Sequence, residues 1–247
     1  KNKIKESLTP KISFRINPRN NMNDYSSSLT NITANNVFDI NRLGLSNDFE
    51  EGRSVTFGLD YKFDQNENNQ SEDIKDKYFE IKLAKVVRDQ NENNIPISST
   101  INQKKSDLFG SINSQLLDNI NLGYDFSLDN DMRTMNSNSI ETEISINNFI
   151  TTFNYIEQRN EIGSTHLLSN VTEYQINDNT SLKFSTRRNK KINLTEYYNL
   201  SYEYKNDCLT AALRFNKSFY QDNDLKPTED LFFAITLGKN ISIDLFD

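Results

Sequence analysis

The sequence predicts an all-β protein, an antiparallel transmembrane β-barrel with about twelve strands. Apolar side chains recur at every second residue through most of the chain, the period of a strand with one apolar and one polar face. Several of these segments run for about nine to twelve residues, the length that a tilted strand needs to cross a bilayer. Short Asn and Asp pairs separate several of them, as two-residue hairpin turns require.

The strands can be placed one by one from this alternation. It is strictest in residues 54–63, 120–128 and 209–216. Pro10 and Pro18 are expected to bound the first strand, because a proline inside a strand removes a ladder hydrogen bond. The expected strands are 11–16, 54–63, 77–88, 107–116, 120–128, 139–146, 149–157, 166–176, 180–187, 193–204, 209–216 and 230–238.

The connections between these strands differ in length. Residues 19–53 are rich in Asn and Ser but have an apolar centre, so we expect this long connection to fold back against other protein. Its apolar residues are Val37, Phe38, Ile40, Leu43 and Leu45. Tight turns are expected at 147–148, 177–179 and 206–207, and longer connections at 129–138, 158–165 and 221–229.

Composition agrees with a barrel once its polar lumen is considered. The chain has 247 residues, enough for one large domain or two small ones, and is 35% apolar. Its mean hydropathy of -0.74 would ordinarily indicate a soluble protein, but a barrel exposes only half of each strand to lipid. The net charge of -7 disfavours nucleic acid as a partner, since phosphate binding requires clustered Lys and Arg. The opening KNKIKESLTP has no apolar core of a signal peptide, so any such signal is missing or was removed.

A soluble β-sandwich is the main alternative fold. Its strands are usually about five or six residues long, and its inner faces should lack charges. The polar faces here carry charges, which suits a water-filled lumen or a solvent-exposed sheet: Asp60, Lys62, Glu80, Lys82, Asp125, Lys183, Glu203 and Arg214. Aromatic residues lie near many strand ends, as interfacial girdles require: Tyr61, Phe63, Tyr78, Phe149, Tyr174, Tyr197, Tyr220 and Phe232.

Catalysis is a third possibility, and the residues do not favour it. The single histidine, His166, has no partnered nucleophile, and no metal, phosphate-loop or serine-hydrolase spacing occurs. Glu141 and Glu143 share a strand face, but strand-face carboxylates of this kind are usually solvated. We therefore predict no enzymatic activity, no cofactor, and no catalytic, cofactor-binding or metal-binding residues.

Three stretches resemble a known family. Residues 198–237 (YNLSYEYKNDCLTAALRFNKSFYQDNDLKPTEDLFFAITL) are similar to the C-terminal end of LptD, the lipopolysaccharide-assembly protein of Gram-negative outer membranes, especially its alphaproteobacterial form. LTPKISFRINP is also similar, as is FDINRLGLSNDFEEGRSVTFGLDYKF. In the latter, Phe38, Asn41-Arg42 and Gly58 match the family's phenylalanine, (D/N)R and strand glycine.

The resemblance implies that residues 1–247 are the C-terminal part of a larger outer-membrane barrel domain. A signal peptide, an N-terminal periplasmic jellyroll and the first half of the barrel would be absent. The implied function is lipopolysaccharide assembly and translocation to the outer leaflet of the cell outer membrane. The implied partners are lipopolysaccharide, outer-membrane lipids, the plug lipoprotein LptE and, through the absent N-terminal domain, the periplasmic lipopolysaccharide bridge proteins. A generic porin-like or scaffold barrel is the alternative.

Two candidate sites follow from the resemblance. Cys208 stands where the family has cysteines that bond to its N-terminal domain; many members have two adjacent cysteines, whereas Leu209 follows here. The last strand would border the missing first barrel strand, at a lateral gate that opens sideways to release lipopolysaccharide. Its residues are Asp230, Leu231, Phe232, Phe233, Ala234, Ile235, Thr236, Leu237 and Gly238.

Overall fold

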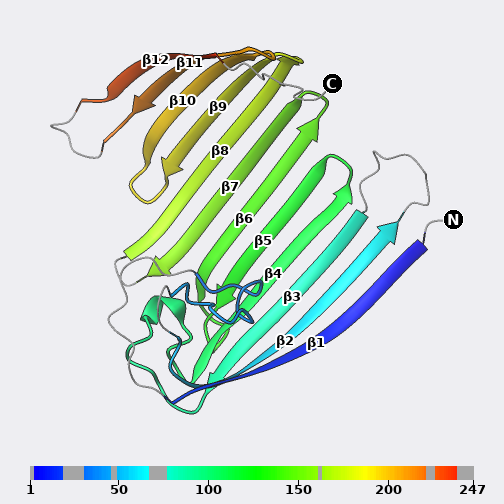
Figure 1. Cartoon of the computed structure of the whole chain (residues 1–247). Coiled ribbons are helices and arrows are strands. Elements are labelled where there is room, and N and C mark those ends of the chain that lie inside the picture. The colour runs from blue at the N-terminus through cyan, green and yellow to red at the C-terminus, as the bar shows by residue number, and fades with distance from the viewer. Residues whose placement is uncertain are drawn as a thin grey trace, which may run out of the picture. The chain divides into compact units, whose positions relative to one another are not determined.

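A computed structural model describes residues 3–18, 31–45, 49–66, 77–160, 163–220 and 226–237. Twelve strands form one sheet, and each pairs with its neighbours in sequence (Figure 1). The strands are β1 (Lys3–Asn17), β2 (Gly52–Asn66), β3 (Lys77–Arg88), β4 (Lys105–Leu117), β5 (Ile120–Leu128), β6 (Met135–Ile146), β7 (Phe149–Asn160), β8 (Gly163–Asn177), β9 (Thr180–Asn189), β10 (Leu194–Lys205), β11 (Leu209–Ser218) and β12 (Thr228–Leu237). A 3-10 turn, η1 (Ile97–Ser99), precedes β4. The predicted all-β, antiparallel class is confirmed.

Helices contribute almost nothing to this fold. Among the described residues, no helix is long and apolar enough to cross a membrane.

Several strands extend beyond their predicted boundaries; β6, for example, begins at Met135 rather than at residue 139. β1 does not begin after Pro10 but runs through it, with Pro10 opposite Leu59. β1 stands at the end of the strand order, with β2 as its one neighbour among the described strands, and an end strand tolerates a missing N–H on its unpaired side. The connection expected at 158–165 is also shorter, because β7 continues to Asn160 and β8 begins at Gly163. Apolar periodicity does not detect strand ends that carry polar side chains. Such residues still belong to the strand because pairing is made by backbone hydrogen bonds.

Contacts within the chain divide it into two compact units. Unit 1 comprises Lys1–Thr142 and Ile156–Thr165, and unit 2 comprises Glu143–Tyr155 and His166–Asp247.

In unit 1, the strand registers place the alternating side chains on two distinct faces. Leu59 pairs with Leu83 on one face, and Asp60 pairs with Lys82 on the other. On β1, Phe14 projects from the apolar face and is 72% exposed. An exposed apolar face of this kind is what lipid contact requires.

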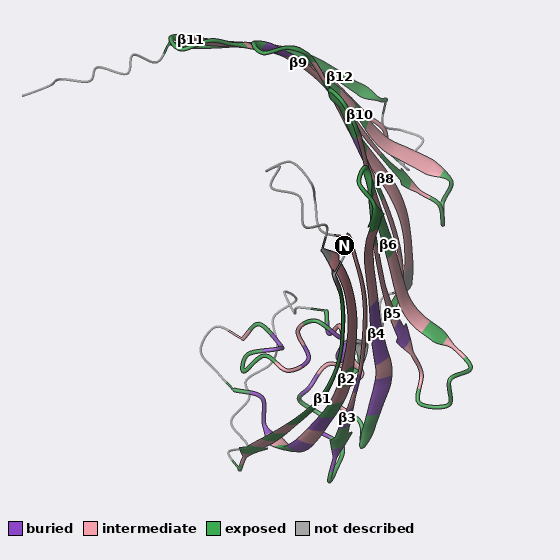
Figure 2. Cartoon of the chain, turned by 90° about the vertical axis from the view of Figure 1, so that its right-hand side faces the viewer, coloured by how far each residue is buried: buried purple, intermediate pink, exposed green. Residues whose placement is uncertain are grey.

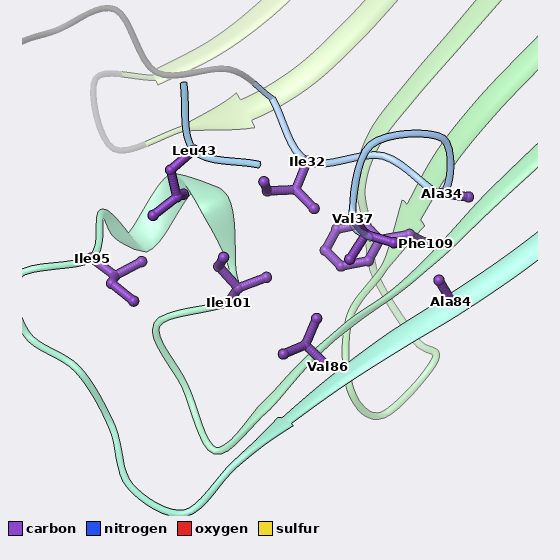
Figure 3. Packing of buried hydrophobic residues seen from close by; sticks show 9 residues of the cluster. All are labelled: Ile32, Ala34, Val37, Leu43, Ala84, Val86, Ile95, Ile101 and Phe109. Atoms are coloured by element: carbon purple, nitrogen blue, oxygen red, sulfur yellow. The ribbon is translucent and has the colours of Figure 1, made fainter. Parts of the chain in front are cut away.

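The polar face of unit 1 carries the hydrophobic core. The connections β1–β2 and β3–β4 lie against this face beside β1 to β4 (Figure 2), and their apolar side chains pack on small or apolar residues of β3 and β4 (Figure 3). The cluster is Ile32, Ala34, Val37, Leu43, Ala84, Val86, Ile95, Ile101 and Phe109, with Phe38 and Leu45 packed against it. The prediction that the long connection folds back is confirmed for its described residues.

Unit 2 repeats the alternation from β8 to β12. Leu213 pairs with Tyr202 on β10 and with Phe233 on β12, which forms a continuous apolar row. The next residue, Arg214, pairs with Ser201 and lies on the opposite face. Leu213 and Arg214 therefore face opposite ways, as the sequence predicts.

Candidate functional site

The candidate site is the connection between β1 and β2, whose described residues 31–45 and 49–51 we call the covering segment. It lies on the polar face of unit 1, which we call the covered face; Thr56, Gly58, Ala84 and Phe109 belong to it. It covers the face that the sequence predicts to line a lumen.

Phe38 attaches the segment to the middle of β2. A Cβ atom placed on Gly58 would lie 2.6 Å from the Phe38 ring, so the ring occupies the space that glycine leaves open. The Lys11 ammonium lies 5.7 Å from the centre of the same ring and pairs with Asp60 at 2.5 Å. Two residues of the matched motif thus form one aromatic–glycine contact.

Asn41 and Arg42, the other matched residues, have different tasks. The Asn41 side chain closes a local turn, donating to the Leu45 carbonyl at 2.7 Å and accepting from the Leu45 N–H at 2.9 Å. Arg42 is buried and binds Glu50 through two parallel hydrogen bonds of 2.6 and 2.5 Å. Bidentate Arg–carboxylate pairs are among the strongest polar contacts in proteins.

The remaining donors of Arg42 join the segment to the sheet. Nη1 donates to the Val37 carbonyl and to the Thr56 hydroxyl, both at 3.1 Å, and Nη2 lies 3.3 Å from the Ser54 hydroxyl. One guanidinium therefore binds the segment's own backbone, its carboxylate and two hydroxyls of β2.

Glu50 is shared by two further arginines from the neighbouring strands. Arg88, at the end of β3, bonds to it directly and also donates to the Glu51 carbonyl at 3.0 Å. Arg15, near the end of β1, lies 3.5 Å from Glu50 and donates to the carbonyls of Ile40 and Asp39 at 2.6 and 2.7 Å. Glu50 thus connects β1, β3 and the covering segment.

The electrostatics of Glu50 follow from this crowding. Burial alone would raise the pKa of its carboxyl, but the hydrogen bond from Arg42 and the charges of Arg42, Arg88 and Arg15 outweigh it and lower the pKa. The carboxylate is thus held ionised. Removing one partner of such a buried pair typically costs about 3–5 kcal/mol, because it leaves uncompensated charge.

The residues predicted to form a gate strand lie in the last described strand. Residues 230–237 lie in β12, which pairs with β11 and has no second neighbour among the described strands. All ten residues of β12 are exposed, and Leu237 reaches 80%. Gly238, the last residue assigned to the gate, lies outside the described residues.

Cys208 lies in the turn between β10 and β11, and not on a strand face. It is exposed, and its thiol is in no disulfide. The Asn206 side-chain oxygen accepts the N–H groups of Cys208 and Leu209 at 3.0 and 2.8 Å, which fixes the turn. The thiol is therefore presented at one end of the sheet.

The residues considered for catalysis lie on two different strands. His166 lies in β8, whereas Glu141 and Glu143 lie in β6. In the part of the chain that the structure describes, no three His, Cys, Asp or Glu residues are grouped so as to hold a metal ion.

Sequence reasoning missed the Arg–Glu cluster. It assigned no role to Glu50, Arg15 or Arg88, and it noted Arg42 only as a family match. The sequence did contain one indication of the cluster. Arg15 and Arg88 lie near the ends of the predicted strands 11–16 and 77–88, and Glu50 lies just before the predicted strand 54–63. Spacing along the chain does not show that β1 and β3 flank β2 on opposite sides.

The family described as LptD, LPS transport system D, matches residues 1–180, about three-quarters of the chain. The chain belongs to the LptD family. LptD proteins transport and assemble lipopolysaccharide at the outer membrane, and they are not an enzyme family. The comparison with curated proteins found no match.

The match also bears on the covering segment. It includes all of β1 to β8, with Phe38, Arg42, Glu50, Gly58 and Arg88. It does not extend to Cys208 or β12, so the two sites predicted from residues 198–237 depend on the resemblance and on the geometry described above.

Proposed function

We propose that this chain is the C-terminal part of a lipopolysaccharide-assembly barrel in the outer membrane and that β12 is its lateral gate strand. The observation that carries the proposal is the state of β12: it ends the strand order and is exposed along its whole length. A strand with a free edge in hydrocarbon leaves backbone groups unsatisfied. Another strand must therefore pair with β12. Opening the sheet at this place breaks only the backbone hydrogen bonds between β12 and that strand.

The connections indicate how the sheet is oriented. Outer-membrane barrels have short periplasmic turns and longer extracellular loops. One end of the sheet carries the short turns 118–119, 147–148, 178–179 and 206–208, together with the paired ends of β2 and β3. The other end carries the described connections 31–45, 49–51, 89–104, 129–134 and 190–193, together with the ends of β7, β8, β11 and β12 that meet there. We therefore assign the first end to the periplasm and the second, with the Glu50 cluster, to the outside.

This orientation supports the proposed role of Cys208. Its turn lies at the assigned periplasmic end, where an N-terminal periplasmic domain would be, and its thiol is exposed. The disulfide would then join that domain to the barrel. The family's alphaproteobacterial form, the plug lipoprotein LptE and the periplasmic bridge proteins remain parts of the same proposal.

The mechanism is passage without bond making. Lipopolysaccharide has acyl chains that partition into lipid and a glycan that requires water. The two faces of the sheet match these halves, since Leu213 and Phe233 lie on the apolar face and Arg214 on the polar one. A sideways opening beside β12 lets the acyl chains enter the bilayer while the glycan moves along the polar face.

A disulfide lock tests the gate in the full-length protein with Cys208 and its partner intact. Ala234→Cys is combined with single cysteines placed one at a time along the strand expected beside β12. The matched control combines Ala234→Cys with Ala212→Cys, its register partner on β11, so that the cross-link lies within the sheet and not across the gate. Oxidation should stop lipopolysaccharide from reaching the cell surface for one Ala234 pair across the gate, and reductant should restore it. Normal surface delivery in a fully cross-linked pair across the gate would exclude a gate at β12.

A further inference from the structure

A cavity lies at the edge of the covering segment, and the proposed barrel and its gate strand give it no role. It has a volume of about 200 Å³, enough for about six waters at ~30 Å³ each or for one sugar ring. All of its lining residues belong to unit 1. Its floor includes Ile32 and Phe109, two members of the hydrophobic cluster (Figure 3).

The cavity lies toward the end of the sheet that we assign to the outside. It is bordered by Asp125 and Ser127 near the end of β5, by the start of β6 and by residues 156–159 near the end of β7. It therefore lies where the polar half of an amphipathic glycolipid would point while its acyl chains leave toward lipid.

The polar groups around the cavity are held in place by one another. The Asn136 amide donates to buried Asp107 at 2.8 Å, and Asp107 also accepts a hydrogen bond from the Ser127 hydroxyl. The Asn138 amide donates to Glu157 at 2.9 Å. Carboxylate and amide oxygens accept more than one hydrogen bond, so this network presents acceptors in fixed positions.

The covering segment contributes to the same network. The Asn35 amide donates to Asp125 at 3.3 Å and to the Ser111 hydroxyl at 3.2 Å. The cavity wall at Asn31, Ile32 and Thr33 is also part of the segment. The cavity therefore exists only while the segment is attached.

Charge and composition select the ligand. The lining carries two carboxylates, Asp125 and Glu157, against one cation, Arg159, so its charge repels a phosphate-bearing group. Fixed amide and carboxylate acceptors above a small apolar floor suit a ring that offers hydroxyls at its edge and C–H groups on its face. A neutral sugar has this chemistry.

We propose that this cavity is a subsite for one neutral sugar residue of the lipopolysaccharide glycan. The inference rests on the proposed function, since the glycan must pass along this face. The subsite would hold the outer part of the glycan while the acyl chains leave beside β12.

Site-specific photo-crosslinking in cells tests the subsite with the full-length protein. A p-benzoylphenylalanine is placed at Ser139, which lines the cavity, at Asn113 on the same face outside it, or at Ile235 in β12. We expect at least about fivefold more lipopolysaccharide adduct at Ser139 than at Asn113, the ratio that one well-placed hydrogen bond supports. Equal adducts at the two positions would overturn the subsite.

Two further comparisons identify the ligand and distinguish failure of the subsite proposal from failure of the proposed function. In cells whose lipopolysaccharide lacks its neutral outer sugars, the adduct should vanish at Ser139 and persist at Ile235; persistence at Ser139 would overturn the assignment to a neutral sugar. Adduct at Ile235 but none at Ser139 overturns the subsite alone. Adduct at neither position contradicts the proposed function as well.

A variant links the adduct to the cavity. Asn138→Ala removes an acceptor together with the hydrogen bond that its amide donates to Glu157, and it should lower the Ser139 adduct by about fivefold. Asn121→Ala, at the other end of β5, is the matched control and should leave it unchanged. Heat-modifiable gel migration shows that each variant is folded. A folded Asn138→Ala protein with an unchanged adduct would count against the subsite.

Discussion

Unit 1 and unit 2 share one strand pattern and differ in what covers their polar faces. In unit 1, the chain folds back over β2 to β4 and buries a hydrophobic cluster with Arg42 and Arg88. In the described part of unit 2, the buried residues are only Thr151, Thr180 and Ala212. Alternating side chains thus form the sheet in both units, but only in unit 1 do the described connections β1–β2 and β3–β4 cover the polar face.

The difference also separates two sources of stability. Unit 1 has side-chain packing and buried ion pairs on one face, independent of any surrounding lipid. The described strands of unit 2 have ladder hydrogen bonds, aromatic contacts such as Phe184 with Tyr198, and exposed ion pairs. Substitutions on the polar face should therefore matter more in unit 1, and substitutions on the apolar face should matter in unit 2 once it is in lipid.

The largest effect is expected at Glu50. Glu50→Ala leaves three arginines without their shared carboxylate and should destabilise the attachment of the covering segment by about 3–5 kcal/mol. Limited proteolysis should then cut within residues 31–51 while heat-modifiable migration of the barrel is retained.

Glu229→Ala in unit 2 is the matched control. It breaks an exposed pair with Lys217 and should cost no more than about 1 kcal/mol. If the two variants resist protease equally, the cluster does not hold the segment.

The next effect tests the apolar face of unit 2. Leu213→Arg should cost roughly 2–4 kcal/mol if the residue lies near the middle of the membrane, because a guanidinium then faces hydrocarbon. Thr210→Arg, on the polar face of the same strand, should be mild. Denaturant titration of the full-length protein folded into lipid vesicles measures both, and equal tolerance of the two would refute the assignment of the faces.

A smaller effect is expected at the aromatic–glycine contact. Gly58→Ala places a methyl group where the Phe38 ring lies, and such overpacking costs about 1–3 kcal/mol. Gly123→Ala, where the nearest atom would be 3.4 Å away, should be neutral. Protease susceptibility of the covering segment compares the two, and a segment as resistant in Gly58→Ala as in Gly123→Ala would show that the ring shifts at little cost.

The smallest effect is expected from a change of pH, with the sequence left unchanged. Because the pKa of Glu50 is lowered from its ordinary value of 4.5, its stabilisation is complete above that value and is lost as the pH falls through the lowered one. The segment should therefore become sensitive to an acid-active protease only below about pH 4.5.

Asp129→Asn is the control for this acid response. The pKa of Asp129 is also lowered, chiefly by the backbone N–H of Arg133, but this residue lies outside the cluster. The variant should keep the acid response, and a response that disappears with Asp129 would locate its cause elsewhere.

Much of the wall could be predicted residue by residue because its periodicity is local. The row of Tyr202, Leu213 and Phe233 follows from alternation, since successive side chains of a strand point to opposite faces. The same reasoning failed at Pro10 and at residues 158–165, where polar or proline-bearing strands continue because a neighbour supplies their hydrogen bonds.

The sequence by itself determined the strand pattern, the opposite placement of Leu213 and Arg214, and the tendency of the β1–β2 connection to fold back. Only the tertiary structure decided that Arg15, Arg42 and Arg88 meet at Glu50, that Phe38 fills the space above Gly58, and that a polar cavity remains beside the covering segment. The physical reason is distance along the chain. Alternation acts between adjacent residues, whereas these contacts join residues brought together by strand order and register.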